Sequence, residues 1–128
     1  MERGFEYLVD VHGEPGARDI FERICTNLFQ SMYGPTTKSV EVSRGDGGID
    51  VLVGDLPKPQ KVYQCKFFLN GLGSSQRQQI KESFKTVTTN YEITDWRLCL
   101  PCILTQQDLL WWSKWKHEQS ELTGCLLY

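Results

Sequence analysis

The chain has 128 residues and a formal net charge of −2, with 40% hydrophobic and 23% charged residues. These values fit one globular domain and argue against a protein that coats nucleic acid through bulk positive charge. No stretch reaches the roughly 18 consecutive apolar residues of a membrane-spanning helix, and the first residues lack a signal-peptide pattern. The five cysteines are an odd number in mostly apolar surroundings, which indicates reduced core thiols in a cytoplasmic protein.

The first predicted element is an amphipathic helix. Residues 1–15 are expected to be irregular or to form a short strand, because residues 12–16 contain two glycines and a proline. From Ala17 onward, apolar residues recur at helical spacing until Gly34-Pro35 ends the pattern. Glu22 lies at the edge of the predicted apolar face. That face consists of Phe21, Ile24, Cys25, Leu28, Phe29 and Met32.

A hairpin and a central strand are predicted next. Alternating apolar and polar residues favour a strand over 37–43, a glycine-rich turn follows over 44–48, and residues 49–53 form the second strand. After a loop over 54–61, residues 62–68 form the central strand. Because strand side chains alternate between faces, Gln64 and Lys66 are expected on one face. The other face then carries Tyr63, Cys65 and Phe67.

Two helices and another strand complete the predicted fold. One helix spans about 74–89, with Ser74 or Ser75 as its cap, and a strand follows over 95–101. The last helix begins at Thr105 with a capping box that ends at Asp108. The apolar residues 122–128 form either a final strand or the cut edge of a longer protein. This order predicts an α/β fold of three layers, with a mixed sheet flanked by helices on both faces.

Polar residues inside the two apolar strands mark a candidate site. Asp50 lies between Ile49 and Val51, and Lys66 lies in the central strand. A buried carboxylate or ammonium group is costly unless it pairs or binds a cation. The segment GDGGID, followed fourteen positions after Asp50 by the triplet Gln64-Cys65-Lys66, resembles the PD-(D/E)xK nuclease superfamily. It is most similar to the Mrr-like restriction endonuclease branch, as found at the N-terminus of bacterial antiphage defence effectors.

The resemblance spans about residues 14–119 and implies a three-layer restriction-endonuclease-like fold with a metal-dependent DNA endonuclease activity of low sequence specificity. Asp50 would be the principal Mg²⁺ ligand, joined by the amide oxygen of Gln64, the backbone carbonyl of Cys65 and, through water, Glu22. Lys66 would orient the attacking water or stabilise developing negative charge. Mn²⁺ is expected to substitute for Mg²⁺. The Mrr-like branch often has Gln at the position of Gln64, and because this amide is neutral, metal affinity is expected to be weaker than with Asp or Glu there.

Basic residues near the candidate site are candidate DNA contacts. Arg77, Lys81 and Lys85 form a stripe at i, i+4 and i+8 on the helix that follows the central strand. Arg44 lies in the turn before Asp50 and is a further candidate. Asp46 is a weaker candidate for metal or DNA binding, because aspartate in a glycine-rich turn is also explained by backbone conformation. The stripe is also compatible with an ordinary solvated helix face.

Two other patterns have ordinary structural explanations. Cys99 and Cys102 have the spacing of a zinc motif, but a zinc site needs four ligands and core thiols are the simpler interpretation. Three of the four tryptophans lie on the last predicted helix, where packing is favoured over stacking on bases.

The sequence leaves two functions open. The first is the endonuclease, acting on double-stranded DNA as one nuclease domain over residues 1–128 of a longer protein, with further domains or a sensor subunit and a homo-oligomeric active state. The second is a catalytically inactive module of the same fold that serves assembly or nucleic-acid binding. The presence of Asp50, Gln64 and Lys66 together favours the enzyme, because buried charge without a metal destabilises a fold.

Overall fold

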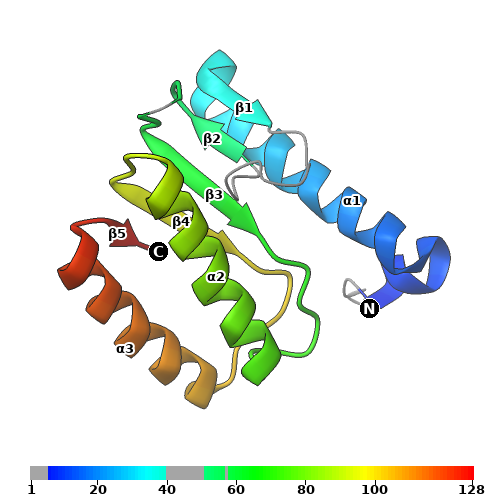
Figure 1. The fold of residues 1–128 in the computed structure, drawn as a ribbon. Helices are drawn as coiled ribbons and strands as arrows, with labels where there is room; N and C mark the ends of the chain where they lie inside the picture. Colours follow the sequence, from blue (N-terminus) through cyan, green and yellow to red (C-terminus); the bar gives the residue numbers. More distant parts are fainter. Residues whose placement is uncertain (1–5, 40–50, 57) are drawn as a thin grey trace.

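A central sheet separates two helical layers in the computed structural model, which describes residues 6–39, 51–56 and 58–128 (Figure 1). Within these ranges the sheet has five strands in the order β1-β2-β3-β4-β5. The strands are β1 (Thr37–Ser39), β2 (Val51–Val53), β3 (Lys61–Cys65), β4 (Asp95–Cys99) and β5 (Leu126–Leu127). The predicted α/β class and mixed sheet are confirmed.

The sheet changes from antiparallel to parallel pairing at β3. β1, β2 and β3 pair antiparallel, as the predicted hairpin requires, whereas β3, β4 and β5 run parallel. Parallel neighbours need long crossovers, and here each crossover is a helix. The apolar C-terminal residues form β5 beside β4, which is one of the two alternatives that their sequence allows. Among the described residues, no helix is both long enough and apolar enough to cross a membrane.

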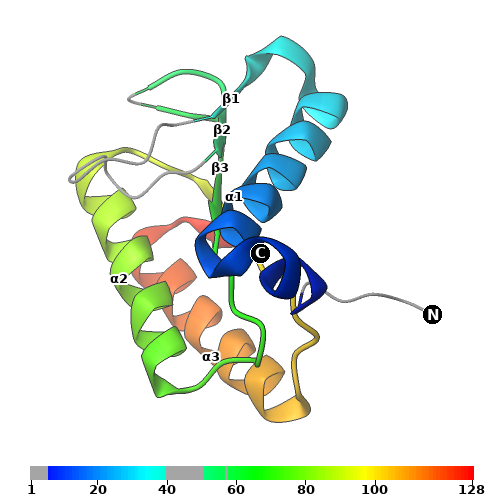
Figure 2. The ribbon, with the colours of Figure 1, turned by 90° about the vertical axis from the view of Figure 1, so that its right-hand side faces the viewer.

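Helix α1 (Glu6–Tyr33) covers one face of the sheet, while α2 (Ser74–Asn90) and α3 (Gln106–Thr123) cover the other (Figure 2). A single turn of 3-10 helix, η1 (Gly34–Thr36), joins α1 to β1. The prediction that residues 1–15 lack a helix is wrong for residues 6–15, which belong to α1. Gly13 is non-helical, with φ 73° and ψ 169°, and Pro15 lies just beyond it. Proline is well suited to the first turn of a helix, so the breaker residues kink α1 rather than prevent its N-terminal segment.

Only part of the predicted apolar face of α1 is buried. Ala17, Phe21, Cys25 and Phe29 form the buried line, at a spacing of four residues. In contrast, Ile24, Leu28 and Met32 remain 48%, 55% and 59% exposed. One layer of helix meets the sheet along one line, so the second half of the apolar pattern is left at the surface.

The larger core lies between the sheet and the α2–α3 layer. Trp96 of β4 is fully buried against Phe84 of α2 and Trp115 of α3, with ring centroids 5.2 and 6.4 Å away. Trp112 lies 5.7 Å from Trp115, and Trp111 stacks on Trp115 at 5.6 Å. The expectation that the tryptophans serve packing is confirmed.

The helix caps agree with the sequence at α3 and differ at α2. The Thr105 hydroxyl accepts a hydrogen bond from the Asp108 amide at 3.1 Å, and the Thr105 amide donates to the Asp108 carboxylate at 3.3 Å. The predicted capping box is therefore present. Helix α2 instead has Gly73 as its N-cap and no side-chain cap, so the assignment of Ser74 or Ser75 is wrong. Glycine is accepted at this position because it, too, readily takes the extended cap conformation.

Candidate metal and nucleic-acid site

The two faces of β3 carry different chemistry. Tyr63 and Cys65 are buried against α1, and Phe67 packs beside them, as predicted. Val62 faces the α2–α3 core, so alternation places Gln64 on that face as well. Gln64 is 4% exposed and pairs in register with Leu98 of β4. A polar amide at this depth is costly to desolvate, so its presence needs a structural or functional reason.

Lys66 continues the ladder directly beyond β3. Its backbone amide donates to the carbonyl of Cys99 at 3.0 Å, and its side chain is half-buried. The chain then borders a cavity of about 310 Å³ at this end of the sheet. Its wall is formed by three segments: Val9, Glu14 and Arg18 of α1, residues 67–70 after β3, and Gln76 and Gln79 of α2. In open α/β sheets, ligands bind in crevices beyond the carboxyl ends of the parallel strands, which is where this cavity lies.

Glu22 lies on α1, in the helical layer opposite to the face that carries Gln64. It is half-buried at the edge of the buried line of α1 and borders a second cavity, of about 300 Å³, with Asp19, Arg23 and Thr26. Since α1 covers the face opposite to Gln64, Glu22 can approach Gln64 and Lys66 only around the end of the sheet. None of these three side chains is isolated, because each takes part in a noncovalent contact.

Three of the predicted site residues lie outside the described ranges. These are Asp50, the predicted principal metal ligand, together with Asp46 and Arg44. Among the residues that the structure does describe, no group of three or more histidine, cysteine, aspartate or glutamate side chains has the arrangement of a metal site. The Mg²⁺ and Mn²⁺ assignment therefore remains a prediction that depends on Asp50.

The predicted basic stripe divides into two parts. Lys81 and Lys85 are exposed and line a groove of about 250 Å³ between α2 and α3. Arg77 is engaged within the protein: its Nε donates to the Leu72 carbonyl at 2.9 Å, and its guanidinium lies 5.2 Å from the centre of the Trp111 ring. The two lysines are therefore more available for phosphate contacts than Arg77.

Asp108 joins the start of α3 to α2 and to the loop between β3 and α2. Its carboxylate lies 3.6 Å from the Arg77 guanidinium. Burial alone would raise the pKa of Asp108, but hydrogen bonds from Thr105 and Leu72, together with Arg77, hold that pKa below its usual value. The loop passes so close that a Cβ at Gly71, where φ is +88°, would lie 2.9 Å from the Asp108 carboxylate. The sequence pattern predicts the capping role of Asp108 but not its contacts with Arg77 and with the loop before α2.

Three thiols meet on the α1 face of β3, an arrangement that the sequence pattern does not predict. Cys25 of α1 packs in one core cluster with Cys65 and Cys99, which are register partners on β3 and β4. Donation from Cys65 and then Cys99 holds the pKa of the Cys25 thiol below its usual range, whereas the same contacts and burial raise the pKa of Cys65. Cys125 lies in the other core, and burial raises its pKa to about 11. All five cysteines are free thiols, as predicted.

Comparison of the chain with protein-family models, with curated proteins and with solved structures finds no match. Function must therefore be inferred from the residues and their arrangement.

Proposed function

We propose that this chain is a metal-dependent DNA endonuclease domain with a restriction-endonuclease-like fold, of the Mrr-like type. The observation that carries the proposal is the placement of Gln64 and Lys66. Gln64 is buried near the carboxyl end of β3, Lys66 follows two positions on, and the next residues of the chain, 67–70, line a cavity of about 310 Å³. The motif GDGGID…QCK and an element order of helix, hairpin, strand, helix, strand, helix support it.

The donor set fits a hard divalent cation. The Gln64 amide, the Cys65 backbone carbonyl and the Glu22 carboxylate all offer oxygen, which Mg²⁺ and Mn²⁺ prefer, and Asp50 would supply the main negative charge. When bound, such a cation activates water and neutralises charge on the phosphate. With one amide in place of a carboxylate, the set has one negative charge fewer, so substrate phosphate would contribute to holding the cation.

The protein residues would position substrate and water. The backbone amide of Lys66 is hydrogen-bonded to β4, which holds the main chain at this point. Its ammonium group would lie beside the scissile phosphate and stabilise the negative charge that develops there. Lys81 and Lys85 would bind flanking phosphates, which carry no base information, so low sequence specificity follows. We further propose a cytoplasmic effector role in bacterial antiphage defence, within a longer protein whose other domains or sensor subunit assemble an oligomer. Cutting both strands calls for two such sites or two successive nicks.

The first test is cleavage of supercoiled plasmid with Mg²⁺ or Mn²⁺, compared with EDTA and with the Asp50→Asn protein. We expect nicked or linear DNA only from the metal-loaded wild-type protein, and no cutting by the variant. Calorimetric titration with Mn²⁺ is run in parallel. A protein that neither cuts DNA nor binds Mn²⁺ would refute the endonuclease proposal. Cutting that persists in EDTA would refute its metal dependence.

A second candidate function is an assembly module, and one observation favours it. Ile24, Leu28 and Met32 form an exposed apolar line along α1. Such a line is the pattern by which a helix contacts a partner, although scattered apolar residues are also common at protein surfaces. If assembly is the function, Leu28→Lys should lower the molar mass measured by light scattering, while Arg23→Ala, on the same helix, should not. An unchanged mass would leave the apolar line without a role in assembly.

A further inference from the structure

The cluster of Cys25, Cys65 and Cys99 lies on the α1 face of the sheet, and the proposed metal site uses none of its thiols, only the backbone carbonyl of Cys65. The three residues come from α1, β3 and β4 and pack in one core cluster, in which Cys65 and Cys99 are register partners on adjacent strands. The described residues offer no metal-binding group, and all three cysteines are unoxidised. Three thiols packed in one cluster can undergo thiol chemistry with one another.

We propose that this cluster is an oxidation site, in which a hydroperoxide such as hydrogen peroxide converts Cys25 and one of the two strand cysteines into a disulfide. The proposal is independent of the nuclease function. Cys99 is half-buried, so a small oxidant can reach the cluster from its side without unfolding the core.

The reaction balances with peroxide as the only oxidant. One thiol sulfur bonds to a peroxide oxygen while the oxygen–oxygen bond breaks, and the released hydroxide takes up the thiol proton as water. The sulfenic acid that results is attacked by the neighbouring thiol, which forms the sulfur–sulfur bond and releases the second oxygen as water. Two thiols and one peroxide thus give one disulfide and two waters.

Sheet geometry favours a bond through Cys25 over one between the two strands. Cys65 and Cys99 are register partners on adjacent parallel strands, which lie about 4.8 Å apart. A disulfide prefers Cβ atoms about 3.8 Å apart, so that pair would have to draw its strands together. Cys25 approaches from the helical layer above the sheet and is free of that constraint. The expected bond therefore joins α1 to β3 or to β4.

The remaining cysteines provide internal controls. Cys125 is buried in the separate core formed by α2 and α3, and Cys102 lies in the loop after β4. Neither belongs to the cluster of Cys25, Cys65 and Cys99. Oxidation that requires the cluster should leave both as thiols.

The test treats the purified, reduced protein with a small molar excess of hydrogen peroxide and counts free thiols after denaturation. We expect a loss of two thiols per chain, full recovery with dithiothreitol, and a monomeric band on a non-reducing gel. Peptide mass spectrometry of the wild-type protein should show Cys25 linked to Cys65 or Cys99. Cys125→Ser should react as the wild type does, whereas Cys25→Ser should keep its four thiols.

Two results would overturn the proposal. One is a wild-type peptide map in which Cys25 remains a thiol, or in which the disulfide involves Cys102 or Cys125. The other is a Cys25→Ser protein, folded by circular dichroism, that loses two thiols at the wild-type rate. Because the peptide map needs no variant, the proposal can fail even if Cys25→Ser does not fold.

Discussion

The backbone amide of Lys66 donates to the carbonyl of Cys99 at 3.0 Å, so the β3–β4 ladder extends one residue beyond the regular strand. This bond fixes the main chain of the candidate catalytic lysine to the most central parallel pair of the sheet. The main chain of Lys66 is thus held although the residue follows the end of the strand, and a held backbone favours the preorganised charge that stabilises a transition state.

Replacing Lys66 with alanine should therefore reduce DNA cleavage by about 10²- to 10⁴-fold while leaving the fold intact. The bond to Cys99 uses the main chain and survives the substitution. Lys61→Ala, at the other end of β3, is the matched control, since Lys61 lies 3.4 Å from Asp95 and away from the candidate site. Plasmid cleavage and thermal melting are measured on both. Equal losses of activity in the two variants would show that Lys66 has no special role.

Gln64→Glu should strengthen metal binding and make the stability of the protein depend on the metal. A carboxylate adds the negative charge that the site lacks, but at 4% exposure it is costly to bury without a cation. Manganese affinity measured by calorimetry should rise, and the melting temperature should fall in EDTA and recover with Mn²⁺. Gln107→Glu, at an exposed position of α3 away from the cavity, controls for the added charge. A Gln64→Glu protein with unchanged Mn²⁺ affinity would argue against a ligand role for this position.

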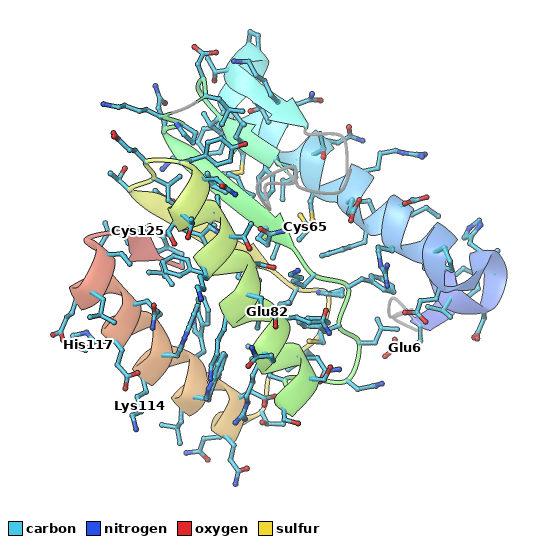
Figure 3. The ribbon with its side chains drawn as sticks, viewed as in Figure 1. Glu6, Cys65, Glu82, Lys114, His117 and Cys125 are labelled. Carbon is cyan, nitrogen blue, oxygen red and sulfur yellow. The ribbon has the colours of Figure 1, made fainter. Side chains whose placement is uncertain are left out.

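Lys81→Glu combined with Lys85→Glu should weaken DNA binding for all sequences alike. For each lysine that no longer binds a phosphate, the slope of log affinity against log salt should become shallower by about one. Binding is measured by fluorescence anisotropy from low to moderate salt, using the Lys66→Ala background so that the DNA stays intact. The control is Lys114→Glu, which reverses the charge of an exposed lysine on α3 instead of α2 (Figure 3). If both proteins bind DNA equally weakly, general charge rather than this groove is responsible.

Asp108→Asn should destabilise the protein near neutral pH, and the difference in stability between variant and wild type should disappear in acid. The folded-state pKa of Asp108 is depressed below the reference value of 3.8, so its stabilisation is present above that value and is lost as pH falls through the folded pKa. The melting temperature of the wild type should exceed that of the variant at pH 7, with the difference shrinking below about pH 4. Glu82→Gln, exposed on α2, should show no such convergence. A difference that stays constant with pH would contradict the assignment.

Trp96→Ala should cost about 3–5 kcal/mol of folding free energy, because a fully buried ring is removed from its packing against Phe84 and Trp115. Trp111→Ala, at the partly exposed rim of the same core, should cost clearly less. Urea denaturation followed by circular dichroism measures both. If Trp111→Ala instead weakened DNA binding at unchanged stability, that tryptophan would be acting as a base-stacking surface.

The elements were predictable where local chemistry decides them. The alternation of Tyr63, Cys65 and Phe67 against Gln64 on β3, and the capping box of Thr105 with Asp108, follow from side-chain period and backbone donors. The class of fold follows from the order of these elements. The predicted burial was wrong where tertiary packing decides it, as at Ile24 and Leu28, which are exposed. A periodic pattern of apolar residues does not show how wide the contact between one helix and the sheet is.

Much of the candidate site could be described only from the three-dimensional structure. Lys66 and Gln64 were predictable as neighbours, since both lie on one strand. Contacts between distant segments were not, because residues 25, 65 and 99 are brought together only by the packing of α1 on a parallel strand pair. The engagement of Arg77 with Leu72 likewise depends on the path of a loop. Asp50 lies outside the described residues, so its role remains a prediction.

The division of β3 into two faces has a consequence for how this chain can vary. Its inward thiol and its polar amide are consecutive residues, Cys65 and Gln64, so a shift of the strand by a single position would exchange them. The amide would then face α1, and a sulfur would replace oxygen at the proposed cation site. Insertions and deletions should therefore be tolerated in the loop before β3 but not within the strand, and a library of single-residue insertions would reveal that boundary.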